Sequence, residues 1–257
     1  MSNKKNIVGA QVSSLRPYLQ TPQELRASLQ KLADMGYRTV QMQWWNPEFE
    51  PELVAAAVRG AGLTCVSTQD LYTAVRDDFE RTVRLNVLCG STCVCVSGIP
   101  APVPDTASVL AFSAELAAMA ARIAPLGMTL AFHPRAREWA PADTAEPGLS
   151  CTELLLEHTP QNVTLGLDLY HSGKAGLAPD ALLRRWAGRV EFVHFKDYCI
   201  APGNVGARGT GRDGLERRRG RLPGNRRALG LCRAGALGKG RFPVYAGEPG
   251  RHARLGL

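Results

Sequence analysis

The feature that most constrains this chain is a pattern that occurs seven times in its first 200 residues. Each occurrence is a short apolar run, rich in β-branched residues, that ends near a polar residue and precedes a segment with helical spacing. The runs are residues 7–12, 39–44, 63–68, 92–97, 128–133, 163–168 and 190–195. Continuous apolar strands are typical of a parallel sheet that is buried on both faces. The pattern therefore predicts strands that alternate with helices around such a sheet.

Helix-start signals support this prediction between the apolar runs. Thr21 and Glu24 have the spacing of a capping box, with Pro22 at the first helical position. Ser150 and Glu153 have the same spacing ahead of the sixth run. We expect a helix to begin at each of these sites.

Seven strands that alternate with helices predict a (β/α)8 TIM barrel whose eighth strand lies in the last part of the chain. The only strand-like run that we identify there is residues 242–247, which we expect to be the eighth strand. A doubly wound open sheet is the alternative, and it is less favoured because no glycine-rich phosphate loop follows any strand. We expect one domain over residues 1–257, well patterned over 6–198 and atypical over 201–257.

The net charge of +8 is unevenly distributed. Residues 201–257 hold 12 arginines and one lysine against three acidic residues, and also 14 of the 26 glycines. The rest of the chain is therefore slightly acidic. A basic arm for nucleic acid would interleave aromatic residues that stack on bases, and this tail does not. We expect no nucleic-acid partner.

The Gly/Arg-rich segment between the seventh and eighth strands, residues 201–241, shows no amphipathic stripe. One interpretation is a long solvated loop. We favour a reading-frame slip near residue 200, because GC-rich codons read out of frame yield mostly Arg, Gly, Ala and Pro. Resequencing the gene across codons 195–245 tests this hypothesis, and an uninterrupted frame would refute it.

The composition also bears on the cellular compartment. No apolar run approaches the length of about 20 residues that a membrane span needs, and residues 1–10 lack a signal-peptide core. Seven scattered cysteines indicate reduced thiols rather than a disulfide framework. Cys93 and Cys95 are interpreted as small buried residues and not as a metal pair. We expect a cytoplasmic protein without a membrane partner.

In a TIM barrel the reactive groups lie at the carboxyl ends of the strands. The expected strand ends are Gln11, Gln43, Thr68, Ser97, His133, Asp168, His194 and Glu248. Two histidines and a carboxylate on three consecutive strands suit Mn²⁺, Co²⁺, Fe²⁺ or Zn²⁺ better than Mg²⁺. The structural alternatives are a turn-capping role for Asp168 and a buried core position for His194.

Two segments carry a resemblance to a known family. Residues 167–171 (LDLYH) and 193–197 (VHFKD) resemble the paired signature of the sugar phosphate isomerase/epimerase family. That family has a xylose isomerase-like TIM barrel and includes epimerases and inosose dehydratases. The resemblance implies that Asp168 and His194 bind a divalent metal ion (Mn²⁺, Co²⁺ or Zn²⁺) and that His171 lies beside the substrate.

The fifth strand resembles a variant of the same family in which the motif AYHNHxFEF occurs. His133 falls where many members have a metal-binding Glu, Arg135 replaces the second His of the variant, and Glu138 matches its acidic residue. The family's last ligand is a Glu that ends the eighth strand, and the resemblance assigns that position to Glu248. It also implies Glu138, His171 and Glu248 as catalytic residues.

The resemblance implies a metal-dependent isomerase or epimerase that acts on a small sugar or polyol through an enediolate. Gln43, Trp44, His171 and Lys196 are the expected substrate contacts, although the Trp44 indole is equally suited to the barrel wall. His133 in place of a Glu keeps one alternative open, an inosose-type or keto-sugar dehydratase. The atypical tail keeps a second one open, a catalytically impaired paralogue. The related zinc-dependent AP endonucleases are excluded because their metal cluster needs more histidine and carboxylate ligands. Dimers and tetramers are common in the family, so the resemblance is compatible with a homo-oligomer, and the sequence leaves the oligomeric state open.

Overall fold

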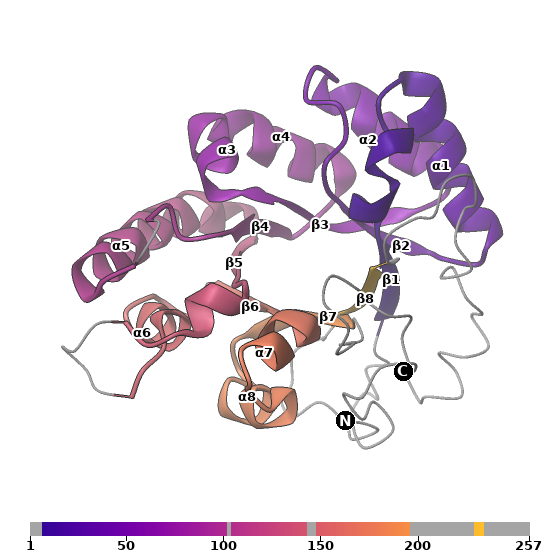
Figure 1. The fold of residues 1–257 in the computed structure, drawn as a ribbon. Helices are drawn as coiled ribbons and strands as arrows, with labels where there is room; N and C mark the ends of the chain where they lie inside the picture. Colours follow the sequence, from indigo (N-terminus) through magenta and orange to yellow (C-terminus); the bar gives the residue numbers. More distant parts are fainter. Residues whose placement is uncertain (1–6, 102–103, 143–147, 196–228, 234–257) are drawn as a thin grey trace, which may run out of the picture.

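The computed structural model describes residues 7–101, 104–142, 148–195 and 229–233, and within them eight parallel strands form a closed barrel in chain order (Figure 1). The strands are β1 (Ile7–Gln11), β2 (Thr39–Met42), β3 (Thr64–Leu71), β4 (Cys93–Ser97), β5 (Thr129–His133), β6 (Val163–Asp168), β7 (Val190–Phe195) and β8 (Leu229–Arg233). The seven strands expected from the apolar runs are confirmed. The predicted (β/α)8 TIM barrel is therefore the fold of this chain.

The helices lie on the outside of the barrel, where they cover the apolar outer faces of the strands (Figure 1). The α-helices are α1 (Pro22–Asp34), α2 (Pro51–Gly60), α3 (Tyr72–Asp77), α4 (Phe79–Cys89), α5 (Thr106–Ile123), α6 (Cys151–Glu157), α7 (Leu169–Lys174) and α8 (Pro179–Arg185). The part of the chain that the structure describes also contains the 3-10 helices η1 (Val12–Tyr18), η2 (Ala124–Leu126) and η3 (Ala136–Trp139).

The helix-start signals act as predicted. The Thr21 hydroxyl accepts the Glu24 amide proton at 3.2 Å, and the Glu24 carboxylate accepts the Thr21 amide proton at 2.9 Å. Ser150 and Glu153 form the same reciprocal pair at the start of α6. Both capping boxes satisfy amide groups that the first helical turn leaves without partners.

The position of the eighth strand corrects the sequence-based expectation. β8 is formed by Leu229–Arg233, not by residues 242–247, and it pairs in parallel with both β7 and β1. A closing strand must match the register of two neighbours at once, a condition that an apolar run in the tail does not reveal in sequence. Residues 242–247 lie outside the described part of the chain.

A small apolar cluster of buried residues comes from strands β4, β5 and β7 of the barrel. Its members are Cys93, Cys95, Ala131 and Phe192. Gly166 makes room for the Phe192 ring, since a Cβ at Gly166 would lie 2.5 Å from the ring carbon Cζ. Burial raises the pKa of the Cys93 thiol to about 12 and raises that of Cys95 as well. These cysteines are thus small buried residues, as expected.

Within the described residues, one helical segment, Thr106–Leu126, is long and apolar enough to span a membrane by length and composition. This corrects the expectation that no run approaches that length, because alanines between the larger residues raise the mean hydropathy. Val109, Phe112 and Leu116 on α5 are buried in the core against the barrel. This face therefore packs as a helix of the barrel does. A buried core helix can meet the length and hydropathy criteria for a membrane span without crossing a membrane.

Candidate metal centre

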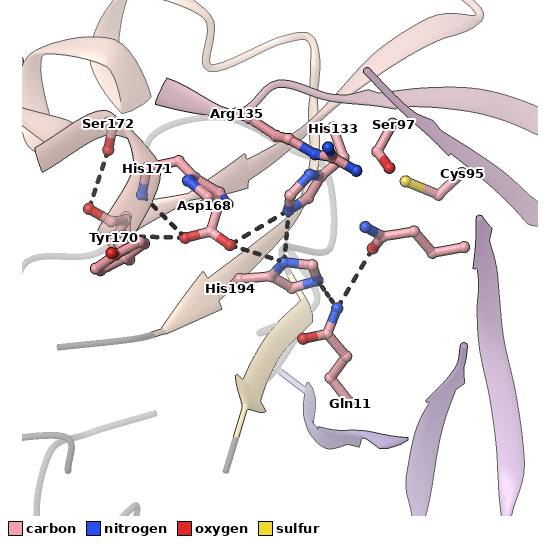
Figure 2. A network of polar contacts seen from close by, with 12 residues as sticks. Gln11, Cys95, Ser97, His133, Arg135, Asp168, Tyr170, His171, Ser172 and His194 are labelled. Atoms are coloured by element: carbon pink, nitrogen blue, oxygen red, sulfur yellow. Dashed lines mark hydrogen bonds and ion pairs between the residues drawn. The ribbon is translucent and has the colours of Figure 1, made fainter. Parts of the chain in front are cut away.

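The barrel brings three of the predicted metal ligands together at the carboxyl ends of β5, β6 and β7 (Figure 2). His133 Nε2 lies 3.3 Å from Asp168 Oδ2 and 3.0 Å from His194 Nδ1. Asp168 Oδ2 lies 3.4 Å from His194 Nδ1. All three side chains are buried, and Asp168 and His194 have no exposed surface. We call these residues the His–Asp–His triad.

Asp168 uses its two carboxylate oxygens differently. Oδ1 accepts hydrogen bonds from the backbone amides of Tyr170 at 2.9 Å and His171 at 3.2 Å, at the start of α7. Oδ2 points to the two imidazoles (Figure 2). The turn-capping role that the sequence offered as an alternative to metal binding is therefore present. It fixes the Asp168 carboxylate so that Oδ2 faces His133 and His194.

The chemistry and the geometry of the triad fit a transition-metal ion. Two imidazole nitrogens and one carboxylate oxygen are ligands that Zn²⁺, Co²⁺ and Mn²⁺ accept. With metal–ligand bonds of about 2.0–2.2 Å, neighbouring ligand atoms lie about 2.8–3.6 Å apart across octahedral and tetrahedral sites. The three observed separations, 3.0, 3.3 and 3.4 Å, fall in this range. A divalent ion would also balance the charge of the buried Asp168 carboxylate.

Four buried glutamine side chains lie next to the triad in the barrel. Gln11 Nε2 lies 3.1 Å from Gln41 Oε1, 2.9 Å from Gln43 Oε1 and 3.4 Å from Gln69 Oε1. The far side of the His194 ring meets this group, because His194 Nε2 lies 2.9 Å from Gln41 Oε1 and 3.3 Å from Gln11 Nε2. We call these four residues the amide cluster.

Glu138 lies in η3 and is not part of the triad. Its carboxylate accepts hydrogen bonds from the Arg135 backbone amide at 2.6 Å and from Arg137 Nε at 2.7 Å, and it approaches the Ile99 amide at 3.4 Å. The side chain is fully buried. In this structure Glu138 fixes the loop after β5, and its catalytic role stays a prediction.

The other predicted site residues have different positions. The His171 ring stands edge-on to His133, with ring centroids 5.9 Å apart, so it lies beside the triad (Figure 2). Gln43 belongs to the amide cluster. Trp44 follows β2 with a φ of 59°, a left-handed conformation that is uncommon for a bulky residue. Lys196 and Glu248 lie outside the described residues.

A cavity of about 250 Å³ opens beside the carboxyl end of β3, between the loop after β2 and helices α3 and α4. Trp44, Trp45, Gln69, Asp70 and Arg81 contribute to its lining. Burial raises the pKa of the Asp70 carboxyl. The triad does not line this cavity, and Gln69 is the residue that links it to the amide cluster.

Two members of the amide cluster, Gln41 and Gln69, were not expected from the sequence. Gln41 lies in β2 and Gln43 follows it by one residue, but both fall in the run 39–44 that was expected as one strand. Residues two positions apart on a strand project to the same side, so this signal for Gln41 was available in the sequence. Gln69 was missed because β3 was expected to end at Thr68. The strand continues to Leu71, and Thr68 faces α4, where its hydroxyl accepts a hydrogen bond from Asn86 Nδ2 at 2.7 Å.

Comparison with known proteins gives structural relatives only. No family model matches this chain, and no curated protein matches it by sequence. Among solved structures, a sugar phosphate isomerase/epimerase from Parabacteroides distasonis superposes with a TM-score of 0.71 at 18% identity, over 93% of this chain and 91% of the other. An L-ribulose 3-epimerase superposes with a TM-score of 0.65 at 18% identity, over 88% of this chain and 80% of the other.

A third match is an IolI protein with a bound zinc atom, with a TM-score of 0.65 at 11% identity over 88% of each chain. Matches of the same fold also include a probable 3-DHS dehydratase from Bacillus anthracis, at 14% identity, and a family 2 AP endonuclease from Brucella melitensis, at 17% identity. At identities this low, the superpositions establish the shared barrel fold and nothing finer. The reaction must be argued from the site.

Proposed function

We propose that this protein is a divalent-metal-dependent isomerase or epimerase that acts on a small sugar or polyol. The observation that carries the proposal is the His–Asp–His triad, buried where the active sites of TIM barrels lie. Its ligand set suits Zn²⁺, Co²⁺ or Mn²⁺. The zinc atom in the structurally similar IolI protein supports a metal in this kind of barrel.

The same reaction chemistry serves isomerisation and epimerisation. A base removes the proton from the carbon next to the carbonyl, the C–H electron pair becomes the C=C bond, and the carbonyl π pair moves onto oxygen. The product is an enediolate. A bound divalent ion would supply positive charge that stabilises its oxygens. Isomerisation returns the proton to the former carbonyl carbon, while the hydroxyl proton passes from the other oxygen to the former carbonyl oxygen and a new C=O bond forms. Epimerisation returns the proton to the original carbon from the opposite face, and the C=O bond forms again at its original position.

Among the described residues, His171 is the candidate for the proton transfer. Its ring is half-buried and lies beside the triad at the start of α7. Neutral imidazole is a suitable general base near neutral pH. Glu138 is a weaker candidate, because both its carboxylate oxygens already accept hydrogen bonds from the loop.

The second candidate function is a dehydratase on the same barrel. β5 contributes His133 to the triad, where a carboxylate would serve a mechanism with two metal-bound bases. A dehydratase needs one base and then expels hydroxide from the carbon next to the enediolate. The structural similarity to a probable 3-DHS dehydratase is consistent with this alternative.

The test measures exchange as well as turnover. The purified chain is depleted of metal with EDTA, reloaded with Mn²⁺, Co²⁺ or Zn²⁺, and incubated in D₂O with a panel of ketoses and cyclic keto-polyols. NMR then detects solvent deuterium at the carbon next to the carbonyl and separates isomers, epimers and dehydrated products. We expect metal-dependent deuterium incorporation with at least one substrate.

Variants sharpen the test. Asp168→Asn and His194→Gln are expected to abolish both metal binding and exchange, whereas Asp180→Asn, at an exposed ion pair with Arg184, serves as the matched control. Full, EDTA-resistant activity in both triad variants would refute the proposal. A wild-type protein that binds no metal and catalyses no exchange would favour the impaired paralogue.

A further inference from the structure

The His194 ring is held from both sides by different kinds of partner. Nδ1 faces the triad, at 3.0 Å from His133 Nε2 and 3.4 Å from Asp168 Oδ2. Nε2 faces the amide cluster, at 2.9 Å from Gln41 Oε1. A neutral imidazole carries one proton, and the nitrogen that holds it cannot bind a metal ion. The tautomer of His194 therefore decides whether the triad has three ligand atoms or two.

The contacts of the amide cluster select one tautomer. Gln41 Oε1 is a carbonyl oxygen and only accepts hydrogen bonds, so the short contact to His194 requires a proton on Nε2. The Gln11 amide also approaches Nε2, at 3.3 Å, and would favour the opposite tautomer. However, that NH₂ group has two protons and two closer acceptors, Gln43 Oε1 at 2.9 Å and Gln41 Oε1 at 3.1 Å. The shorter distances assign its protons there.

The orientation of the Gln41 amide is fixed by the same network. Its Oε1 accepts a proton from Gln11 at 3.1 Å, and the second lone pair of this carbonyl oxygen is directed at His194 Nε2, 2.9 Å away. A flipped Gln41 would place its NH₂ group against the NH₂ group of Gln11, with donors facing each other. The side chain is fully buried, so water cannot relieve such a mismatch.

We propose that Gln41 is a positioning residue for the metal centre: its carbonyl oxygen holds His194 as the Nε2–H tautomer, so that Nδ1 is unprotonated on the side of His133 and Asp168. Histidine ligands commonly donate their second ring N–H to an oxygen, which sets ring orientation and ligand basicity, and loss of such a partner typically weakens metal binding 10- to 100-fold. This inference adds a positioning residue to the proposed metal site, and the effect of Gln41 on metal affinity rests on the proposed function.

The first test measures metal affinity rather than activity. The full chain is titrated with Zn²⁺ in competition with a chromophoric chelator, for wild type and three variants whose folding is checked by circular dichroism. Gln41→Met removes the acceptor while keeping the size of the side chain, and we expect about 10- to 100-fold weaker binding. Gln41→Glu keeps an acceptor and is expected to bind within about threefold of wild type or more tightly.

The matched control is Gln69→Met. Gln69 is also buried and belongs to the amide cluster, but its contact is with Gln11, at 3.4 Å. We expect its affinity to stay within about threefold of wild type, since surrounding packing is disturbed without loss of the His194 acceptor. Equal weakening in Gln69→Met and Gln41→Met would overturn the inference, because packing alone would then explain both.

The second test needs no metal. Long-range ¹H–¹⁵N correlation spectra of the metal-free protein report the tautomer of each histidine ring, and a His194→Gln variant identifies the signals of His194. We expect the Nε2–H form in wild type and its loss in Gln41→Met. An Nδ1–H ring in wild type would overturn the inference even if the protein binds metal. If wild type binds no metal but shows the Nε2–H form, the proposed function fails and the positioning by Gln41 stands.

Discussion

His133 Nε2 lies 3.0 Å from His194 Nδ1, although the two residues are 61 positions apart in the chain. His133 ends β5 and His194 lies near the end of β7, so the two residues flank β6, the strand that carries Asp168. Two imidazole nitrogens at this distance in a buried site either share a proton or bind one ion. The second possibility makes the pair part of a metal centre and leads to the first prediction.

Replacement of His133 is expected to change metal binding according to the ligand that remains. His133→Leu leaves two ligands and should weaken Zn²⁺ binding by at least about 100-fold, whereas His133→Glu restores a third ligand and should bind with a shift toward Mn²⁺, because carboxylate oxygens favour harder ions. Chelator competition with Zn²⁺, Co²⁺ and Mn²⁺ measures both effects. Equal affinity of wild type and His133→Leu would exclude His133 as a ligand.

Gly166→Ala is expected to destabilise the protein by about 1–3 kcal/mol, because the new methyl group would lie 2.5 Å from the Phe192 ring in a filled barrel interior. Urea unfolding measures the change in the free energy of unfolding. Gly188→Ala is the matched control, since no atom lies within 4 Å of a Cβ at that exposed position. The double change Gly166→Ala with Phe192→Leu should recover part of the loss. A neutral Gly166→Ala would mean that the Phe192 ring can move.

Glu138→Gln separates a structural from a catalytic role. The fully buried carboxylate accepts hydrogen bonds from Arg137 Nε and the Arg135 amide, and hydrogen bonds to charged groups are worth about 1.5–3 kcal/mol each. We expect a loss of about 1–3 kcal/mol in unfolding free energy, with the metal affinity nearly unchanged. Glu48→Gln, at an exposed position, is the control. Unchanged stability with complete loss of exchange activity would instead assign Glu138 to catalysis.

Asp70 predicts a pH dependence of stability. Burial raises the pKa of its carboxyl above the ordinary value of 3.8, while the Leu71 amide and Arg16 lower it to a smaller extent. The folded state therefore holds this proton more tightly than the unfolded state does. The contribution favours folding below pH 3.8 and is lost as the pH rises through the raised pKa of the folded state.

It follows that an uncharged side chain at position 70 should stabilise the protein at neutral pH. Asp70→Asn keeps an oxygen that can accept the Leu71 amide proton, at 2.7 Å in wild type, and removes a partly buried charge. We expect a higher Tm than wild type at pH 7 and a smaller difference at pH 4.5, measured by thermal unfolding. Asp77→Asn, at an exposed ion pair with Arg76, should show no such trend. A lower Tm for Asp70→Asn at pH 7 would contradict the prediction.

The first seven strands were predictable because a local apolar run marks each of them, whereas the eighth was expected at residues 242–247 and lies at Leu229–Arg233. Residues 163–168 and 190–195 were expected with the bounds that the structure has. Asp168 and His194 were expected together because parallel strands in a barrel end at one edge. Glu138 shows where this reasoning stops, since the position of a side chain after a strand depends on the loop that carries it.

The sequence by itself determined the alternation of strands and helices, the capped helix starts, and the residue types that reach the carboxyl edge of the barrel, because periodicity and capping act over a few residues. Only the tertiary structure decided that Leu229–Arg233 closes the barrel, that Gly166 gives its space to Phe192, and that Gln41 meets His194. These relationships join residues that are far apart in the chain, and their energies depend on distances that exist only after the barrel has closed.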